Sequence, residues 1–274
     1  MMHWLKNLLA PPAPIPSALW LATLSSYSFL TALSAPERSQ LKKLSEAFLA
    51  RKEFSGAHGL QVTDDMAVAI AAQACLPLLH MGKAGARLYD DFTGIVVHPG
   101  AMLARRRMTD AAGVVHHYTE VLAGEAMSSG PVTLSWEDVA TASTSADRGY
   151  NVVIHEFIHK IDMRSGTPNG CPPLPSRIAK TQWQRVMQAN FDDFRERVAM
   201  AERFGGEAPW LDAYGATAPA EFFAVASEAY FVNRQRFTQE FAALAELFDA
   251  FFRSDQLLLP PQTQRLNHNS RHRL

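Results

Sequence analysis

Residues 151–163, "NVVIHEFIHKIDM", contain two histidines four positions apart, with a glutamate directly after the first. Because a helix turns once per about 3.6 residues, His155 and His159 project from one face and their imidazoles can converge on one ion. The apolar residues before and within the motif occupy the opposite face, so we expect a buried helix that presents both histidines to a cleft. The alternative interpretation is two histidines that share a helix face without a ligand.

Glu156 is the candidate proton-transfer residue of such a site. A catalytic zinc ion usually has three protein ligands, with imidazole nitrogens at about 2.0 to 2.1 Å, and leaves its fourth position to water. The Glu156 carboxylate could take a proton from the water that the ion activates and pass it to a leaving amine. Asp162, on the same helix face, is expected to orient a metal-bound histidine or to make structural hydrogen bonds. It is poorly placed to be a direct ligand, because it lies one turn further along the helix.

The third ligand is expected among acidic residues of the C-terminal helices. The segment 212–231, "DAYGATAPAEFFAVASEAYF", offers Glu221 and Glu228, which are seven residues apart and therefore roughly on one helix face. Pro219 in the first turn places Glu221 near the helix start, just after a loop that carries Tyr214. Spacing alone does not choose between the two glutamates.

Composition describes an ordinary globular protein. The chain has 274 residues, of which 47% are hydrophobic and 19% charged, and its formal net charge is −1. This charge provides no overall field for nucleic acid or an anionic membrane, so neither is an expected partner. The N-terminal apolar runs are broken by prolines and serines, which argues against a membrane span or a cleaved signal. With only two cysteines, Cys75 and Cys171, we expect a cytoplasmic protein.

The pattern of periodicity predicts an α+β fold that is mainly helical. Helices are expected over 16–33, 177–203, 219–233 and 237–253. Two more are expected to begin at Ser34, which has the capping-box spacing to Glu37, and at Thr63. Runs rich in β-branched residues predict a small, largely antiparallel sheet; they are "GLQV" at 59–62, "TGIVVHPG", "VVHHYTEVLAGEAM" and "GPVTLSW". Residues 16–256 are expected to form one domain. Residues 1–15 are expected to be poorly ordered, and the basic tail 257–274 disordered.

Several segments of the chain closely resemble the Mlc titration factor A family of bacterial zinc metallopeptidases. They are "FLARKEFSGAHGLQVTDDMAVAIAAQACLPLL", "GPVTLSWEDV", "NVVIHEFIHKIDM" followed by "NGCPPL", and "DAYGATAPAEFFAVASEAYF". The motif and the Tyr-x6-Glu-Phe-Phe segment are also similar to those of the anthrax lethal factor catalytic domain. The resemblance implies a zincin-like fold that holds one zinc ion per chain.

The resemblance also assigns residues that spacing left open. In this family the third zinc ligand is the glutamate of the Pro-Ala-Glu-Phe-Phe segment, which corresponds to Glu221. It implies further that the hydroxyl of Tyr214 stabilises the tetrahedral oxyanion, as a phenol can do by donating a hydrogen bond. Glu228 then becomes a supporting or structural residue.

The strand at 130–136 resembles the strand that borders the cleft in such peptidases, where an exposed edge can hold a peptide by backbone hydrogen bonds. A mid-sheet strand packed on the helix is the alternative. His116 and His117 are not expected to form a second metal site, because adjacent strand residues point to opposite faces.

The leading functional hypothesis is a cytoplasmic zinc peptidase that acts on peptides or proteins, with an aminopeptidase-like activity as one form of it. The resemblance implies a second partner, the transcriptional repressor Mlc or a similar protein, which controls sugar uptake. Two alternatives stay open: a regulatory binding protein with a structural zinc ion, and a zinc hydrolase that acts on other carbonyl compounds such as esters.

Overall fold

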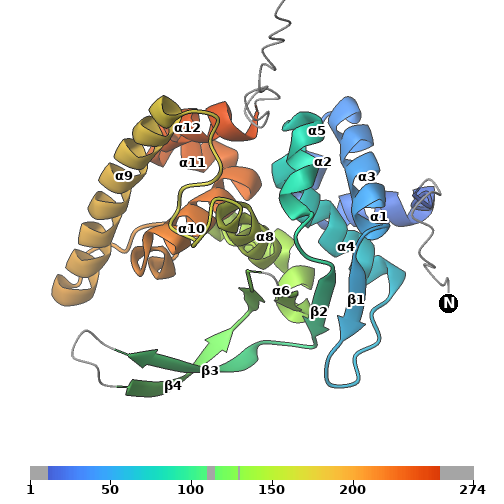
Figure 1. Cartoon of the computed structure of the whole chain (residues 1–274), viewed down its shortest axis with the longest axis horizontal. Coiled ribbons are helices and arrows are strands. Elements are labelled where there is room, and N and C mark those ends of the chain that lie inside the picture. The colour runs from blue at the N-terminus through green and yellow to red at the C-terminus, as the bar shows by residue number, and fades with distance from the viewer. Residues whose placement is uncertain (1–11, 110–114, 129, 254–274) are drawn as a thin grey trace, which may run out of the picture.

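The computed structural model describes residues 12–109, 115–128 and 130–253, and for Lys83, 103–109 and 115–122 only the course of the backbone. Figure 1 shows α8 (Val152–Met163) between the N-terminal helices on the right and the C-terminal helices on the left, with the strands below. The N-terminal helices are α1 (Ser17–Ser26), α2 (Ser28–Thr31), α3 (Ala35–Leu49), α4 (Asp64–Cys75) and α5 (Gly82–Gly85). The others are α6 (Trp136–Ala140), α7 (Ala142–Ser145), α9 (Arg177–Phe204), α10 (Pro219–Val232), α11 (Arg234–Glu240) and α12 (Ala242–Phe252).

Most predicted helices are present, and their start signals act as expected. The Ser34 side chain accepts from the backbone N–H of Glu37, whose carboxylate accepts in return from the backbone N–H of Ser34, so the capping box of α3 is formed. Thr63 caps α4 in a similar way. The single helix expected over 16–33 is divided into α1 and α2, because Tyr27 adopts an extended backbone and is itself buried.

The four-stranded sheet corrects the expectation of a largely antiparallel one. Its order is β1 (Glu53–Gly56), β2 (Gly94–His98), β6 (Val132–Ser135) and β5 (Gly124–Ala126). β2 is parallel to both β1 and β6, and only β5 and β6 are antiparallel. The helices between β1 and β2 supply the crossover that a parallel pair needs, and strand composition does not reveal strand direction. A separate antiparallel hairpin is formed by β3 (Met102–Thr109) and β4 (Val115–Leu122).

One strand prediction was wrong in position, and the alternative left open for another is now decided. The segment 59–62 is not a strand; the chain pairs with β2 earlier, over β1, and then turns at His58 and Gly59, which both have positive φ. β6, within the predicted segment 130–136, is hydrogen-bonded on both sides, which is the mid-sheet alternative. The strand at the edge of the sheet is β5.

The two helices that carry the candidate site are deeply buried. On α8 the apolar residues are almost fully enclosed; they are Val152, Val153, Ile154, Phe157, Ile158 and Ile161. On α10 every residue from 222 to 230 is buried. α8 also packs on β5 and β6 at one side and on α10 at the other. The buried helix predicted from the motif is therefore the centre of the core.

The predicted ends of the chain are only partly described. Residues 1–11 and the tail 257–274 lie outside the described residues. Ile15, just before the predicted domain start, is buried, and its backbone N–H donates to Glu46 at 2.9 Å. Within the described ranges we find no helix with the length and apolar character needed to span a bilayer. His116 and His117 lie where no side chain is described, so their role stays a prediction.

Among the described residues, no hydrogen bond joins Asp162 to a histidine. Its buried carboxylate instead accepts from the backbone N–H groups of Asn169, Gly170 and Cys171, at 2.7 to 3.0 Å. This is the structural alternative. Gly170, with φ +75°, lies so close to α10 that a Cβ there would be 2.5 Å from the carbonyl oxygen of Pro219. Asp162 thus fixes the loop on which the start of α10 packs.

We predict that Asp162→Asn lowers the free energy of unfolding by about 3 kcal/mol, because an amide offers one acceptor oxygen to three buried N–H donors. Denaturant unfolding measures this difference. The control is Asp192→Asn on the exposed face of α9, which should change the free energy by less than about 0.5 kcal/mol. Equal stability of the two variants would contradict this role of Asp162.

Candidate metal centre

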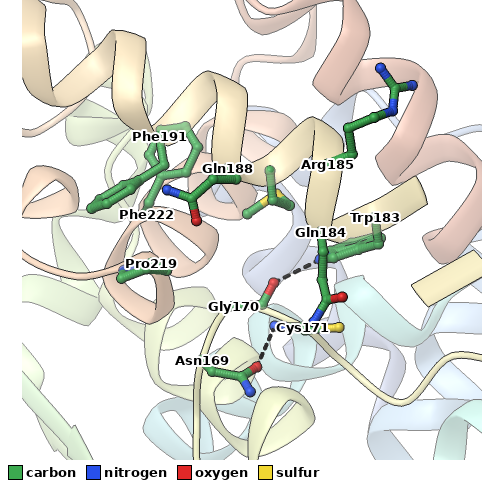
Figure 2. Close-up of a pocket in the computed structure, with 11 residues that line it drawn as sticks. Asn169, Gly170, Cys171, Trp183, Gln184, Arg185, Gln188, Phe191, Pro219 and Phe222 are labelled. Atoms are coloured by element: carbon green, nitrogen blue, oxygen red, sulfur yellow. Dashed lines mark hydrogen bonds between the residues drawn. The ribbon is translucent and has the colours of Figure 1, made fainter. Parts of the chain in front are cut away.

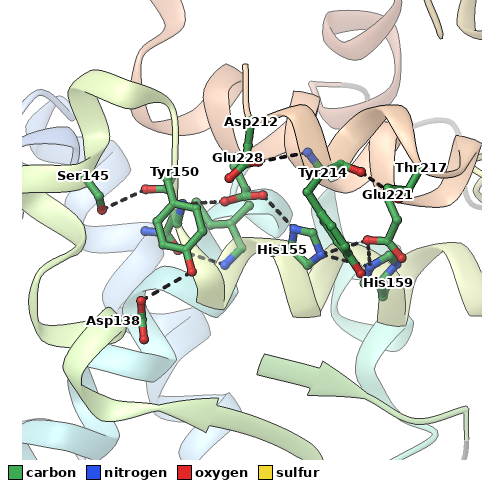
Figure 3. A network of polar contacts seen from close by, with 12 residues as sticks. Asp138, Ser145, Tyr150, His155, His159, Asp212, Tyr214, Thr217, Glu221 and Glu228 are labelled. Carbon is green, nitrogen blue, oxygen red and sulfur yellow. Dashed lines mark hydrogen bonds and ion pairs between the residues drawn. The ribbon is translucent and has the colours of Figure 1, made fainter. Parts of the chain in front are cut away.

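Three potential ligand atoms converge between α8 and α10 (Figure 3). The Nε2 atoms of His155 and His159 are 3.1 Å apart. Oε2 of Glu221 lies 3.2 Å from the first and 3.1 Å from the second. Among the described residues, this is the one group of three or more ligand side chains with such a spacing.

The spacing of these atoms fits a small tetrahedral ion. Ligand atoms at about 2.0 to 2.1 Å from a tetrahedral zinc ion are about 3.3 Å from one another. The three observed distances are within 0.2 Å of that separation. Two imidazole nitrogens and a carboxylate oxygen are moreover the donor set that zinc accepts in catalytic sites. His155, His159 and Glu221 can therefore hold a metal ion without rearrangement.

Glu228 supports this group from the other side of His155. Its buried carboxylate accepts from Nδ1 of His155 at 2.7 Å and from the backbone N–H of Asn151 at 2.6 Å. A proton held on Nδ1 leaves Nε2 free for an ion. Asn151 in turn caps α8, since its side chain accepts from the backbone N–H of Ile154 at 2.9 Å. One carboxylate thus orients both the imidazole and the start of its helix.

Burial and charge shift the pKa values of the group strongly. Burial alone would lower the pKa of His155, but the Glu228 and Glu221 carboxylates raise it well above the usual 6.5. Burial would raise the pKa of Glu221, but hydrogen bonds from His155 and His159 keep it far below its usual range. Both shifts favour a protonated imidazole beside an ionised carboxylate when no ion is bound.

Glu156 is also buried, directly beneath the edge of the sheet. A Cβ on Gly124 of β5 would lie 2.5 Å from its Oε1. Burial raises the pKa of Glu156 to about 7, against the opposing effect of the two histidines. A carboxylate with a pKa near neutrality can both accept and return a proton.

Tyr214 stands at the open side of the group. Its ring centroid is 6.1 Å from that of His155, and the side chain is 40% exposed. Figure 3 shows the ring directed toward His155, Glu221 and His159. The backbone is held in place by Asp212, which accepts from the N–H of Tyr214 at 2.9 Å, and by Thr217, which donates to its carbonyl at 2.7 Å.

A cavity of about 460 Å³ lies on the other side of the first turn of α10, against α9 (Figure 2). Its apolar wall is formed by Trp183, Met187, Phe191 and Phe222. Pro219 also lines it, but none of the three candidate ligands does. The cavity is therefore a neighbour of the metal group and not part of it.

The residues singled out from the motif and the segment 212–231 lie together, except for Asp162, which binds the loop at 169–171. Sequence reasoning missed Gly124, because nothing in "LAGEAM" indicates that a strand crosses the glutamate of the motif. It also missed Asn151, for which there was a signal: an asparagine that directly precedes an apolar helical run is a common N-cap.

A metallopeptidase family and several curated proteins are similar to this chain in sequence. A family model described as glucose-regulated metallo-peptidase M90 matches residues 1–253. Curated relatives named Mlc titration factor A include one from Cronobacter sakazakii, which is 31% identical over 93% of this chain and 92% of its own length. Another, from Serratia proteamaculans, is 33% identical over 83% of this chain and 84% of its own length. The chain thus covers most of the length of these relatives.

We predict that Glu228→Gln weakens zinc binding by about 10- to 100-fold, because the amide orients the imidazole without a negative charge. A competition titration with a chromophoric chelator measures the affinity. Glu246→Gln, at an exposed position of α12, is the control and should bind zinc as the parent does. Unchanged affinity in Glu228→Gln would show that this carboxylate does not support the ligand.

The raised pKa of His155 makes metal binding depend on pH in a defined direction. An ion must displace the proton, so affinity should keep rising with pH above 7, by up to about tenfold per unit. Calorimetry in two buffers of different ionisation enthalpy should then show release of about one proton at pH 7. Binding with no proton release at this pH would contradict the predicted protonation.

Proposed function

Since the chain belongs to the glucose-regulated metallopeptidase M90 family, we propose that it is a zinc-dependent peptidase with one ion per chain. His155, His159 and Glu221 are the proposed ligands. The observation that carries the proposal is the approach of their three ligand atoms to within 3.2 Å of one another, beside a buried carboxylate.

The proposed mechanism divides the reaction among three groups of the chain. A bound zinc ion would polarise the scissile carbonyl and lower the pKa of a water molecule at the site. Glu156 accepts the proton of the attacking water and returns it to the leaving amine, a task that suits its pKa of about 7. The Tyr214 hydroxyl donates to the oxygen that becomes negatively charged. Glu228 keeps His155 oriented throughout.

The edge strand β5 is the proposed binding surface for the peptide. It is the last strand of the sheet on the side of α8, and its Gly124 touches Glu156. An extended peptide can add to such an edge through backbone hydrogen bonds, which select weakly for sequence. Because β5 has three residues, it can hold only a short stretch of peptide. We therefore propose cleavage near the amino terminus as the form of the activity to test first.

A second proposal concerns a protein partner. The relatives carry the name Mlc titration factor A, which supports binding of an Mlc-like repressor by this chain. In a purely regulatory protein the zinc site would be structural, and such sites are usually closed by four protein ligands. Three converging ligands with Glu156 beside them favour hydrolysis.

Both cysteines are free and buried, which supports the proposed cytoplasmic location.

We predict that Glu156→Gln retains zinc but hydrolyses peptides at least about 100-fold more slowly, because proton transfer is lost while the ligands stay in place. The assay measures bound zinc together with cleavage of amino-terminal amides, internal peptides and esters. Glu196→Gln, exposed on α9, serves as the control and should be as active as the parent. If Glu156→Gln retained its zinc and cleaved at the parental rate, the mechanism would be wrong.

A further inference from the structure

Lys160 is fully buried on α8, directly after His159, and the mechanism above does not use it. Its ammonium group donates to three backbone carbonyl oxygens, those of Met127 at 2.5 Å, Gly130 at 3.0 Å and Ser128 at 3.4 Å. An ammonium has three N–H donors, so this set satisfies it completely. Such charge-assisted hydrogen bonds are stronger than those between neutral groups.

The three carbonyl groups belong to the turn that joins β5 to β6. Among the backbone hydrogen bonds of the described residues, the turn itself is closed by a long one, from the N–H of Met127 to the carbonyl of Pro131 at 3.4 Å. Gly130 allows the tight approach, since a Cβ there would be 2.7 Å from Cβ of Met127. The ammonium of Lys160 therefore ties this turn directly to α8.

Lys160 and Glu156 are four residues apart and so share one face of α8, next to the face that carries the histidines. Glu156 meets the beginning of β5 at Gly124, and Lys160 meets the turn at its end. The short edge strand is thus fixed to the candidate metal helix at both ends. These two contacts, together with its pairing to β6, locate β5 relative to α8.

We propose that Lys160 is a positioning residue that holds β5 at the correct place for a peptide to lie along the site. The proposal rests on the proposed peptidase function. A lysine that only stabilises the core would affect all substrates alike. Binding of a peptide long enough to pair with β5 depends on the position of this strand, whereas binding of a single-residue substrate does not.

Lys52 provides a matched control. It is also buried, and its ammonium donates to two backbone carbonyls, those of Tyr89 and Phe92, both at 2.5 Å. It lies 3.6 Å from the centroid of the Phe92 ring, while Lys160 lies 4.4 Å from the same ring. None of the carbonyl groups that it binds belongs to the turn between β5 and β6.

The test compares Lys160→Met and Lys52→Met for two substrates, an amino-acid arylamide and a hexapeptide. For Lys160→Met we expect the parental zinc content, a KM for the hexapeptide raised roughly tenfold, and a KM for the arylamide within about twofold of the parent. Amide hydrogen exchange over 124–135 should be at least about tenfold faster. Lys52→Met should lower stability without separating the two KM values.

Gly130→Ala tests the same contact from the strand side and does not depend on the folding of Lys160→Met. The added methyl group should displace the turn between β5 and β6 without a change in the sequence of α8. We expect the KM for the hexapeptide to rise and the KM for the arylamide to stay near the parental value. The proposal is overturned if both variants keep parental exchange over 124–135, or if KM changes equally for both substrates. If the parent binds zinc but cleaves neither substrate, the proposed function fails instead, and exchange alone decides whether Lys160 holds the strand.

Discussion

The packing of α10 against α8 is the constraint on which the candidate site depends. Glu221 and Glu228 are two turns apart on α10, and they meet the two nitrogens of one imidazole: Glu221 at Nε2 of His155, Glu228 at Nδ1. The apolar residues around them hold the helices together and exclude water. Burial of several carboxylates with two imidazoles is costly, and a bound cation would offset much of that cost. The arrangement is most readily understood as one built to hold an ion.

The surrounding structure fixes this contact from three directions. Asp162 binds the backbone of the loop that packs on Pro219 and so places the first turn of α10, where Glu221 lies. Asn151 caps α8 and shares the Glu228 carboxylate with His155. Lys160 ties the edge strand to the same helix. Polar side chains on or next to α8 thus determine the relative positions of three elements that are distant in sequence.

Much of this could be predicted from the sequence because it is local. Periodicity and caps located α3, α4, α8, α9 and α10, and the four-residue spacing placed both histidines on one face. Strand direction could not be predicted. Between β2 and β6 the chain forms the β3–β4 hairpin and then β5, and the composition of the strands does not show that β2 and β6 end up parallel. Spacing left Glu221 and Glu228 equivalent, and the packing of α10 on α8 separates them. The sequence also left the role of Asp162 open, because its carboxylate binds backbone N–H groups at 169–171, a contact that helix spacing does not record.

X-ray absorption at the zinc edge of the loaded protein tests the central claim most directly, because it reports the ligand atoms around the ion. The account predicts two imidazole nitrogen ligands and further oxygen ligands at about 2.0 to 2.1 Å. In His159→Ala, one imidazole ligand should be lost. It also predicts that Glu221→Ala loses the ion or replaces the carboxylate by solvent. A sulfur ligand, or a spectrum unchanged in both variants, would contradict a centre built from His155, His159 and Glu221.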